Sequence, residues 1–221
     1  MQVIDDLKQL YINRFTKNDR EERKIVWQVL CQNFFQKYID PQSSILDLGA
    51  GYCEFINSIK AKRKIAIDLN TETKKFAQKG VEVFICSSTN LPKSLAGKID
   101  NVFASNFFEH LPTKEHVIKT LAQVKRVLAG NGKIIILHPN IRFLGGQYWD
   151  FLDHQLPLSE KSLVEALTLS NFKILKVVPK FLPYTTKTKL PKRPWLVKLY
   201  LILKPAHFIF GKQSLIIAQK P

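Results

Sequence analysis

Short apolar runs alternate with stretches of helical periodicity along most of this 221-residue chain. The apolar runs are continuous, which is typical of strands buried on both faces of a sheet. We expect strands at residues 44–48, 64–68, 81–85, 101–105, 133–138, 172–178 and 214–219. We expect helices at residues 3–16, 20–38, 54–60, 72–78, 113–128 and 159–169. This alternation predicts an α/β fold with a doubly wound, mostly parallel sheet and helices on both faces.

The same pattern predicts one domain with four parts. N-terminal helices occupy residues 1–40, and the alternating core occupies residues 41–180. A basic and aromatic insertion, residues 181–212, separates the last two expected strands, and the final strand lies in residues 213–221. With 45% apolar and 11% aromatic residues, the chain can bury a sizeable core and does not resemble a disordered protein.

Leader and cysteine patterns predict a cytoplasmic protein. The N-terminus lacks the long apolar run of a signal peptide. The most apolar stretch, residues 195–210, is interrupted by two lysines and a proline, so we expect no transmembrane helix. Cys31, Cys53 and Cys86 have neither paired nor metal-ligand spacing, which favours reduced thiols.

The most specific motif follows the first expected strand. In residues 45–53 this strand runs into a turn that contains Gly49 and Gly51. Glycine allows unusual backbone conformations and lets a ligand approach the chain, and the following helix presents N–H groups to an anion. Asp68 ends the second expected strand, 21 residues after Asp47. An acidic residue at this distance suits the two hydroxyls of a ribose, so the pair of features predicts a ligand that contains one.

On these residues the sequence resembles class I S-adenosylmethionine-dependent methyltransferases of the type 11/12 bacterial subgroup. Their first motif, acidic-x-Gly-x-Gly-x-Gly, is matched by Asp47, Gly49 and Gly51, with Cys53 in place of the third glycine. The resemblance implies a Rossmann-like, seven-stranded sheet, mostly parallel with a last antiparallel strand. It also implies S-adenosylmethionine as the cofactor.

Further segments extend this resemblance in order over residues 20–180. Residues 87–92 match the adenine-flanking segment, residues 100–111 match the fourth-strand motif, and residues 127–133 match the turn before strand five. The cofactor contacts that the resemblance implies are Asp47, Gly49, Ala50, Gly51, Asp68, Leu69, Ser88, Thr89 and Asn106.

A nicotinamide dehydrogenase is the competing interpretation of a glycine turn with a ribose acid. It would need Gly-x-Gly-x-x-Gly, and Glu54 occupies the third glycine position. A pyrophosphate would meet a carboxylate there, so the sequence disfavours this class.

Candidate catalytic residues follow the strands at the carboxyl edge of the expected sheet, where such folds bind ligands. A hydroxyl acceptor needs a base to take its proton. We predict His154, His138 and Asp153 as catalytic candidates. His154 and Asp153 lie in an aromatic segment, residues 148–154, whereas His138 ends a buried strand and suits a structural role equally well.

Glu109 and His110 raise the question of a metal. Some class I relatives, including small-RNA 2′-O-methyltransferases, place two glutamates and a histidine around a divalent ion here. Asn106 stands where the first glutamate would be, and the loss of an anionic oxygen weakens cation binding. We therefore expect no metal, and interpret Glu109 and His110 as contacts at a helix start near the cofactor.

Positive charge is concentrated at the C-terminal end. The chain has a formal net charge of +16, and no acidic residue follows Glu165. In the insertion, cations precede an aromatic and aliphatic stretch, which is typical of a membrane-surface element. A pocket lid and a grip on RNA phosphates are the alternatives, and the chain has no recognisable RNA-binding module. The residues of this pattern are Lys187, Lys189, Lys192, Arg193, Trp195, Leu199, Ile202 and Leu203.

Together these features predict an S-adenosylmethionine-dependent methyltransferase, O-directed on a glycan, glycolipid or lipid-linked acceptor. Residues 139–151 and 181–187 look like a bacterial subgroup that modifies glycans or glycolipids. The expected partners are a small-molecule or lipid-linked substrate and, peripherally, an anionic membrane. An RNA methyltransferase and a non-catalytic methyltransferase-like scaffold are the alternatives.

Overall fold

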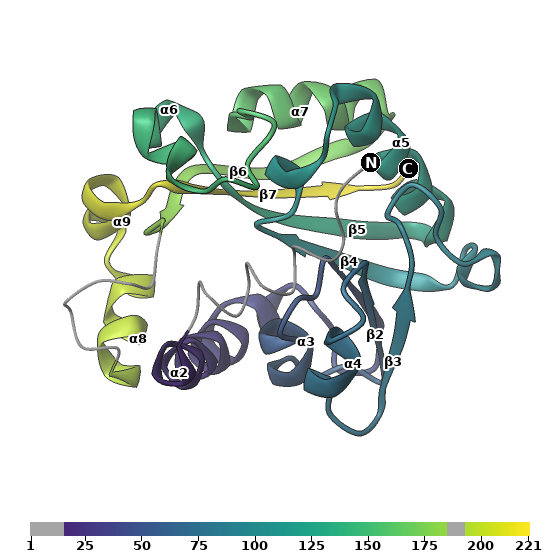
Figure 1. The fold of residues 1–221 in the computed structure, drawn as a ribbon, viewed down its shortest axis with the longest axis horizontal. Helices are drawn as coiled ribbons and strands as arrows, with labels where there is room; N and C mark the ends of the chain where they lie inside the picture. Colours follow the sequence, from purple (N-terminus) through teal and green to yellow (C-terminus); the bar gives the residue numbers. More distant parts are fainter. Residues whose placement is uncertain (1–15, 185–192) are drawn as a thin grey trace.

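A twisted, seven-stranded sheet crosses the computed structural model, which describes residues 16–184 and 193–221 (Figure 1). The strands are β1 Ser44–Leu48, β2 Arg63–Asp68, β3 Val81–Ile85, β4 Ile99–Ser105, β5 Leu128–Pro139, β6 Lys173–Leu182 and β7 Gln213–Gln219. Their order is β3-β2-β1-β4-β5-β7-β6. β7 runs antiparallel to both β5 and β6, and the other neighbouring pairs are parallel. This arrangement confirms the predicted fold class.

Helices connect the strands and cover both faces. The α-helices are α2 Lys17–Asn33, α3 Glu54–Ser58, α4 Thr73–Phe76, α5 Lys114–Val127, α6 Ile141–Leu144, α7 Glu160–Leu169, α8 Pro194–Ile202 and α9 Lys204–Phe210. The 3₁₀ helices are η1 Phe35–Lys37, η2 Lys93–Leu95, η3 Phe108–His110 and η4 Gly145–Asp150. Residues 3–15 of the helix expected at residues 3–16 lie outside the described residues, and Thr16 is the extended N-cap of α2.

Several helix boundaries differ from the prediction. The helix expected at residues 20–38, for example, ends at Asn33 and is followed by η1. The pattern placed Leu128 in the helix of residues 113–128, but Leu128 begins β5 and pairs with Ile99 of β4. The backbone of Leu128 therefore extends the sheet, and α5 ends at Val127. At its start, α5 is capped as its sequence indicates, because Thr113 accepts a hydrogen bond from the His116 N–H.

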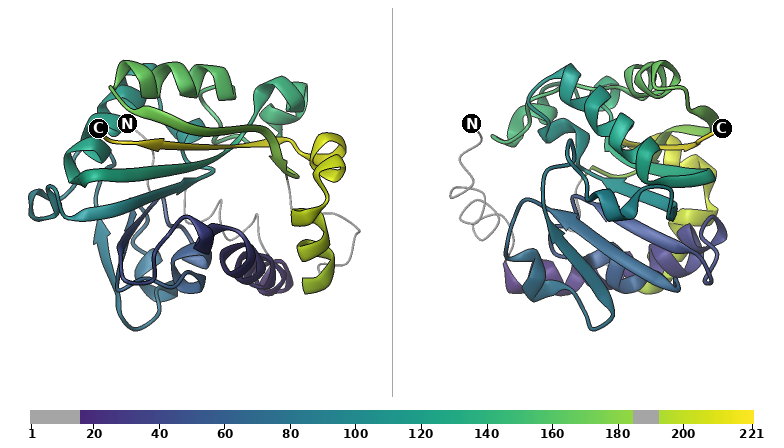
Figure 2. Two further views of the ribbon diagram at one scale, coloured as in Figure 1. Left: turned by 180° about the vertical axis from the view of Figure 1, so that it is seen from behind. Right: turned by 90° about the vertical axis from the view of Figure 1, so that its right-hand side faces the viewer.

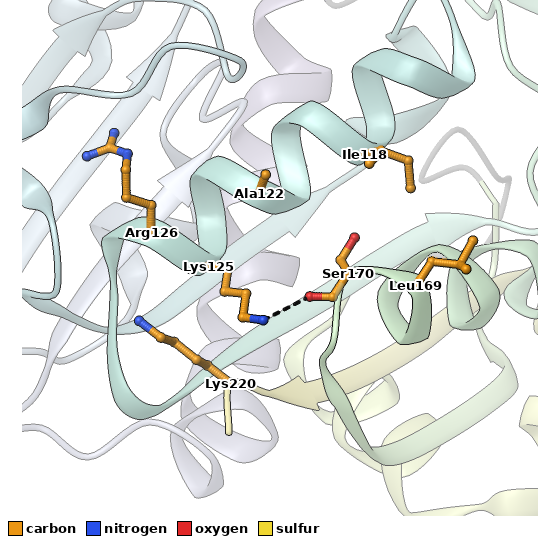
Figure 3. Close-up of a pocket in the computed structure, with 7 residues that line it drawn as sticks. All are labelled: Ile118, Ala122, Lys125, Arg126, Leu169, Ser170 and Lys220. Atoms are coloured by element: carbon orange, nitrogen blue, oxygen red, sulfur yellow. Dashed lines mark hydrogen bonds between the residues drawn. The ribbon is translucent and has the colours of Figure 1, made fainter.

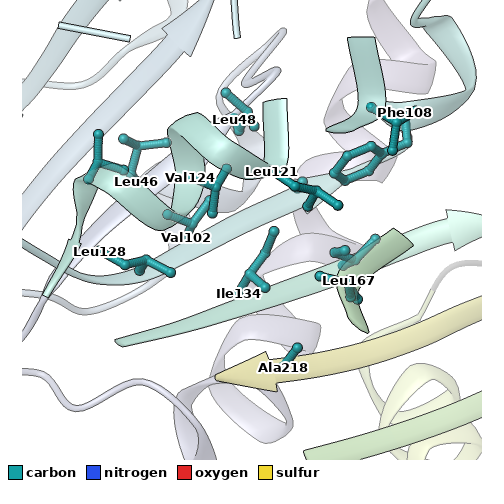
Figure 4. Close-up of a cluster of buried hydrophobic side chains, with 14 of the residues drawn as sticks. Leu46, Leu48, Val102, Phe108, Leu121, Val124, Leu128, Ile134, Leu167 and Ala218 are labelled. Carbon is teal, nitrogen blue, oxygen red and sulfur yellow. The ribbon is translucent and has the colours of Figure 1, made fainter. Parts of the chain in front are cut away.

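Alternate residues of each buried strand point to opposite faces, which gives two hydrophobic clusters, here called the α5-side and the α2-side cluster. On one face, Leu46 and Val102 pack with Leu121 and Val124 of α5 and Leu167 of α7 (Figure 4). On the other face, strand side chains pack with residues of α2, α3 and η1, namely Ile45, Phe103, Ile135, Trp27, Phe35 and Phe55. Figure 2 shows α7 and α2 on opposite sides of the sheet.

The connection between β6 and β7 carries α8 and α9 to the carboxyl edge of the parallel strands. Gln213, which begins β7, pairs with Pro139 at the end of β5. From this edge α8 packs against α2, and α9 packs against β6 (Figure 1). None of the described helices is long and apolar enough to cross a membrane.

An open hollow of about 460 Å³ lies at the opposite edge, between α5, α7 and the end of β7 (Figure 3). The Lys125 ammonium lines it and donates to the Ser170 carbonyl. Lys220, also in its wall, donates through its backbone N–H to the Gly132 carbonyl at the amino half of β5. This hollow is therefore remote from the strand ends where the predicted site residues lie.

Candidate functional site

The glycine turn after β1 has the backbone conformation that its sequence requires. Gly49 and Gly51 have φ angles of +74° and +50°. A Cβ atom on Gly49 would lie 2.5 Å from Cδ2 of Phe107, so a side chain there would collide with that ring. Cys53, which replaces the third glycine of the family motif, also has a positive φ of +60°. Cys53 therefore has the left-handed backbone conformation although it is not a glycine.

Asp68 is held beside this turn by backbone donors. Its Oδ2 accepts a hydrogen bond of 2.7 Å from the Gly51 N–H, and its Oδ1 accepts one of 2.8 Å from the Asn70 N–H. Burial raises the pKa of Asp68, although these donors and the charge of His110 oppose the shift. Each oxygen keeps a lone pair that a hydroxyl can donate to. The side chain is therefore fixed in a way that fits the ribose of the expected cofactor.

Parallel register brings the ends of four strands together. Leu48 pairs with Ile67 of β2 and with Ala104 of β4, and Ser105 of β4 pairs with Leu137 of β5. The residues that follow these positions therefore share one edge of the sheet. They include the glycine turn, Asp68 and the predicted residues after β4 and β5.

The other expected cofactor residues occupy different surroundings. Asp47 is buried inside β1 behind the turn, where burial, Glu54 and Asp68 raise its pKa well above the ordinary value. Ser88 is also buried and shares a hydrogen bond of 2.8 Å with Thr120 of α5. Ala50, beside the turn, is also buried. Of the remaining expected residues, Leu69 and Thr89 are half-buried and Asn106 is exposed.

A cluster of titratable side chains lies next to this edge. Glu109 and His110 belong to η3 directly after β4, and Phe108 of the same helix packs into the α5-side hydrophobic cluster. The Glu109 side chain is 0% exposed. Its Oε2 lies 3.2 Å from Nδ1 of His138, and its Oε1 lies 3.8 Å from Nε2 of His110. His154 joins from the loop after η4, with its ring centroid 5.0 Å from that of His110.

Backbone carbonyls orient two of these rings. Nδ1 of His154 lies 2.8 Å from the Tyr148 carbonyl oxygen, and Nδ1 of His110 lies 3.0 Å from that of Asp153. Because a carbonyl only accepts hydrogen bonds, Nδ1 carries the proton in both rings. In the neutral rings, Nε2 is then the atom with the lone pair.

Electrostatics keep the central carboxylate charged. Burial alone would raise the pKa of Glu109, but its contact with His138 and the charges of His110, His138 and His154 hold it below the ordinary value. Burial lowers the pKa of His154, although the negative charge of Glu109 opposes that shift. The cluster therefore combines an anionic Glu109 with a His154 ring that tends to stay neutral.

The structure brings all three predicted catalytic residues to this cluster, in unequal positions. His138 is completely buried, and its Nε2 lies 3.3 Å from the Leu158 carbonyl, so both ring nitrogens face protein acceptors. His154 is 8% exposed, and the Asp153 carboxylate lies 3.4 Å from Nδ1 of His110. Glu109 is the central residue, although its sequence position suggested only a helix-start contact. The adjacent Glu109 and His110 were the sequence signal for this cluster. Asn106, in place of a glutamate, led to the interpretation of the pair as a helix-start contact.

The cluster and the glycine turn belong to one region, since the charge of His110 acts on Asp68. The family described as "Methyltransferase domain" matches residues 46–136, which include the turn, Asp68, Glu109 and His110. Residues 46–136 of this chain form a methyltransferase domain. The domain is of the type 11 kind, and the cofactor of such domains is S-adenosylmethionine.

Solved methyltransferase structures share the fold of this domain. A SAM-dependent methyltransferase from Archaeoglobus fulgidus has a TM-score of 0.65 and 21% identity, over 90% of this chain and 94% of that one. A SAM-dependent methyltransferase from Thermotoga maritima, described as a possible histamine N-methyltransferase, has a TM-score of 0.66 and 18% identity, over 92% and 95% of the two chains.

A curated relative adds a distant sequence match. The probable tRNA methyltransferase 9B of Mus musculus is 29% identical over 100 residues, which is 45% of this chain but 19% of that protein. The methyltransferase domain thus aligns with a small part of a much longer relative.

Proposed function

We propose that this methyltransferase transfers the methyl group of S-adenosylmethionine to a hydroxyl of a glycan or glycolipid acceptor that is anchored in an anionic membrane. The exposed apolar surface of residues 194–210, here called the α8–α9 lobe, is the observation that carries this proposal. The methyltransferase domain supports the reaction, and the lobe supports the class of acceptor.

One side of the α8–α9 lobe packs on the protein. Val197, Tyr200 and Leu201 contact the α2-side hydrophobic cluster, and the Tyr200 hydroxyl donates to the Phe181 carbonyl. Seven other large apolar side chains of the lobe are exposed, namely Trp195, Leu199, Ile202, Leu203, Phe208, Ile209 and Phe210. So many exposed apolar side chains over 17 consecutive residues indicate a surface that binds something apolar.

Charge favours an anionic membrane as the partner. Lys198 and Lys204 on the lobe and Arg193 directly before it are exposed, and no acidic residue follows Glu165. Each cation near an anionic bilayer contributes about 1 kcal/mol, and apolar side chains add a contribution that salt does not screen. The further cations Lys187, Lys189 and Lys192 of the predicted pattern lie outside the described residues.

Position links the lobe to the chemistry. Because α8 and α9 join β6 to β7 at the carboxyl edge, they border the edge that carries the glycine turn and the Glu109 cluster. A membrane that contacts the lobe would present its headgroups near this edge. The fold would then receive an acceptor whose lipid part stays in the bilayer.

The proposed chemistry needs alignment and removal of a proton. The cofactor supplies an activated methyl group, so the chain must place the acceptor oxygen in line with it. The Nε2 lone pairs of His110 and His154 are the groups that this region offers to a hydroxyl, or to a cation that activates one. We assign His138 and Asp153, both predicted as catalytic, to positioning Glu109 and His110.

RNA is the second candidate acceptor, and it has a specific observation in its favour. The curated relative is named as a probable tRNA methyltransferase, and the chain has a net charge of +16. RNA binding through phosphates would depend steeply on salt, whereas apolar contact with lipid would not. A scaffold without catalysis would bind the cofactor but show no turnover.

Co-sedimentation with vesicles tests the proposed membrane contact. We expect binding to vesicles of phosphatidylcholine with 30–40% phosphatidylglycerol (roughly the anionic content at which basic surfaces bind well), and weak binding to phosphatidylcholine alone. Leu199→Ala should weaken binding about 3- to 10-fold, because the lost side chain no longer enters the interface. Leu175→Ala on β6 is the matched control, since both leucines are 44% exposed.

Equal effects of Leu199→Ala and Leu175→Ala would contradict a role for the lobe. Binding of a structured RNA with a steep salt dependence, in the absence of vesicle binding, would replace the lipid proposal with the RNA alternative. Methyl transfer is then measured with radiolabelled S-adenosylmethionine and a lipid extract. Absence of labelled lipid, with the cofactor bound, would favour the scaffold.

A further inference from the structure

We propose that Glu109, His110 and His154 form a binding site for one divalent transition-metal ion. One ligand atom from each of these side chains lies within 4.8 Å of the other two. The inference rests on the proposed function only where it assigns the ion a role in methyl transfer. The sequence favoured no metal because Asn106 replaces a carboxylate, whereas the fold supplies His154 as a donor from a distant loop.

The two imidazole rings are already oriented as ligands. The carbonyls of Tyr148 and Asp153 hold the Nδ1 protons of His154 and His110, which leaves Nε2 as the donor atom in each ring. Metal-binding histidines usually donate their other N–H to a carbonyl or carboxylate in this way. The Asp153 carboxylate, 3.4 Å from Nδ1 of His110, reinforces this orientation.

The carboxylate between these rings lacks a suitable donor. Glu109 is fully buried, and within the described part of the chain neither of its oxygens has a hydrogen bond of good geometry. Oε1 lies 3.8 Å from the Nε2 atom of His110 and accepts no hydrogen bond from it. Buried charges are ordinarily paired or bound to a metal. A cation between these atoms would bind both donor atoms and compensate the buried negative charge of Glu109.

The surroundings fix the proposed site as a metal site requires. His138 contacts the second oxygen of Glu109 at 3.2 Å, and Phe108 anchors η3 in the core. Only small movements separate this arrangement from coordination. The ligand atoms lie within 4.8 Å of one another, and an ion with bonds of about 2.1 Å holds two ligands roughly 3.0–3.4 Å apart, so the side chains must converge by at most about 1.4–1.8 Å.

The donor set points to a class of ion. Two imidazole nitrogens and one carboxylate suit Zn²⁺, Fe²⁺, Co²⁺ or Mn²⁺, whereas Mg²⁺ and Ca²⁺ prefer oxygen ligands alone. Three protein ligands also leave open positions for an acceptor oxygen. This set resembles a catalytic metal site more than a closed structural one.

In the proposed reaction, the ion binds the acceptor hydroxyl and lowers its pKa, so that its proton passes to solvent. The oxygen then forms a bond to the methyl carbon while the carbon–sulfur bond breaks and its electron pair stays on sulfur. His154 is a ligand in this scheme, and the ion takes over the task of a protein base. The sulfonium charge is neutralised in the same step.

Titration of chelator-treated, dialysed protein with Co²⁺ and Zn²⁺ tests the site without cofactor or acceptor. We expect one equivalent to bind, with visible Co²⁺ absorption bands that Zn²⁺ abolishes. Glu109→Gln and His154→Ala should each weaken binding at least about 100-fold, and His138→Gln about 10- to 100-fold. His116→Ala is the control, because His116 lies on α5 outside the cluster and should leave binding unchanged.

Metal should also raise the melting temperature of wild type and His116→Ala, but not of Glu109→Gln. If Glu109→Gln does not fold, His154→Ala and the isosteric His154→Gln provide the same comparison. Lack of stoichiometric binding by the wild type, or binding that survives both Glu109→Gln and His154→Ala, would overturn the site. Metal binding without lipid methylation would leave the site standing and reject the proposed function instead.

Discussion

Hydrogen-bond partners give the carboxylates at the carboxyl edge different tasks. Asp68 accepts from two backbone N–H groups and stays half-buried, so its outer lone pairs can meet ribose hydroxyls. Glu109 is fully buried against histidine rings and has no well-aligned donor among the described residues. The same functional group therefore suits a nucleoside in one place and a cation in the other.

Replacement of Asp68 tests the first of these tasks. Asp68→Ala should weaken S-adenosylmethionine binding about 10- to 150-fold, because a charge-assisted hydrogen bond contributes about 1.5–3 kcal/mol. Calorimetric titration measures the change, with circular dichroism as the check on folding. Glu165→Gln, an exposed acid on α7, is the control and should bind normally. Unchanged affinity in folded Asp68→Ala would remove Asp68 from the cofactor site.

At the residue scale, the sequence predicts local relationships better than distant ones. The glycine turn and Asp68 belong to one strand–helix–strand unit, so their spacing was sufficient to pair them. His154 meets Glu109 only through the conformation of the loop after η4, 45 residues further along the chain. The periodicity of the sequence does not predict this proximity, so His154 was predicted as a catalytic candidate and Glu109 only as a contact near the cofactor.

At the element scale, the turn after β1 combines two constraints on one residue. Gly49 needs a positive φ and has the Phe107 ring where a Cβ would extend. Gly97 also has a positive φ, of +66°, but a Cβ there would meet nothing within 4 Å. A side chain at Gly97 would therefore cause backbone strain alone, whereas one at Gly49 would cause both strain and a steric collision.

Alanine at each glycine measures the two contributions. Gly97→Ala should lower the free energy of unfolding by about 1–2 kcal/mol through backbone strain alone. Gly49→Ala should cost about 1–3 kcal/mol more, because Phe107 must move, and should also weaken cofactor binding. Urea denaturation and calorimetry provide both numbers. Equal losses in the free energy of unfolding of the two variants would show that the Phe107 ring moves aside without destabilising the fold.

Strands were easier to predict than the helices of the lobe. Apolar runs located all seven strands of the sheet. Burial on both faces leaves little ambiguity for the central strands, whereas the edge strands β3 and β6 are more exposed. In α8, apolar residues such as Val197 face the core while others, such as Leu199, face outward. A helix that is apolar all round shows no preferred face, so its pattern could not say which side packs.

At the scale of the whole molecule, the sheet separates two cores and leaves buried thiols in the α2-side one. Cys31 and Cys53 are both 0% exposed. Burial, followed by the charge of Asp47, raises the pKa of the Cys31 thiol far above its ordinary value of 9.0, and Lys64 opposes this only in part. Burial and nearby carboxylates act on Cys53 in the same direction.

These raised pKa values predict a loss of stability in alkaline solution. Below pH 9 the thiols are protonated in both states, so their contribution to stability is fully present. Above pH 9 a thiol ionises in the unfolded chain but stays protonated in the fold, so each one makes the free energy of unfolding fall by about 1.4 kcal/mol per pH unit. Tyr148 and Tyr200 add to the slope above pH 10, since burial raises the pKa of both.

Cys31→Ala isolates one thiol within this behaviour of the whole molecule. Its free energy of unfolding should start lower at pH 8, because the core loses a sulfur atom, but should then decline less steeply. Between pH 9.5 and 10.5 the slope should be shallower than that of the wild type by up to about 1.4 kcal/mol per pH unit. Urea denaturation under reducing conditions at several pH values gives both slopes. Parallel slopes would mean that Cys31 ionises as readily in the folded protein as in the unfolded chain, and that water reaches the α2-side core.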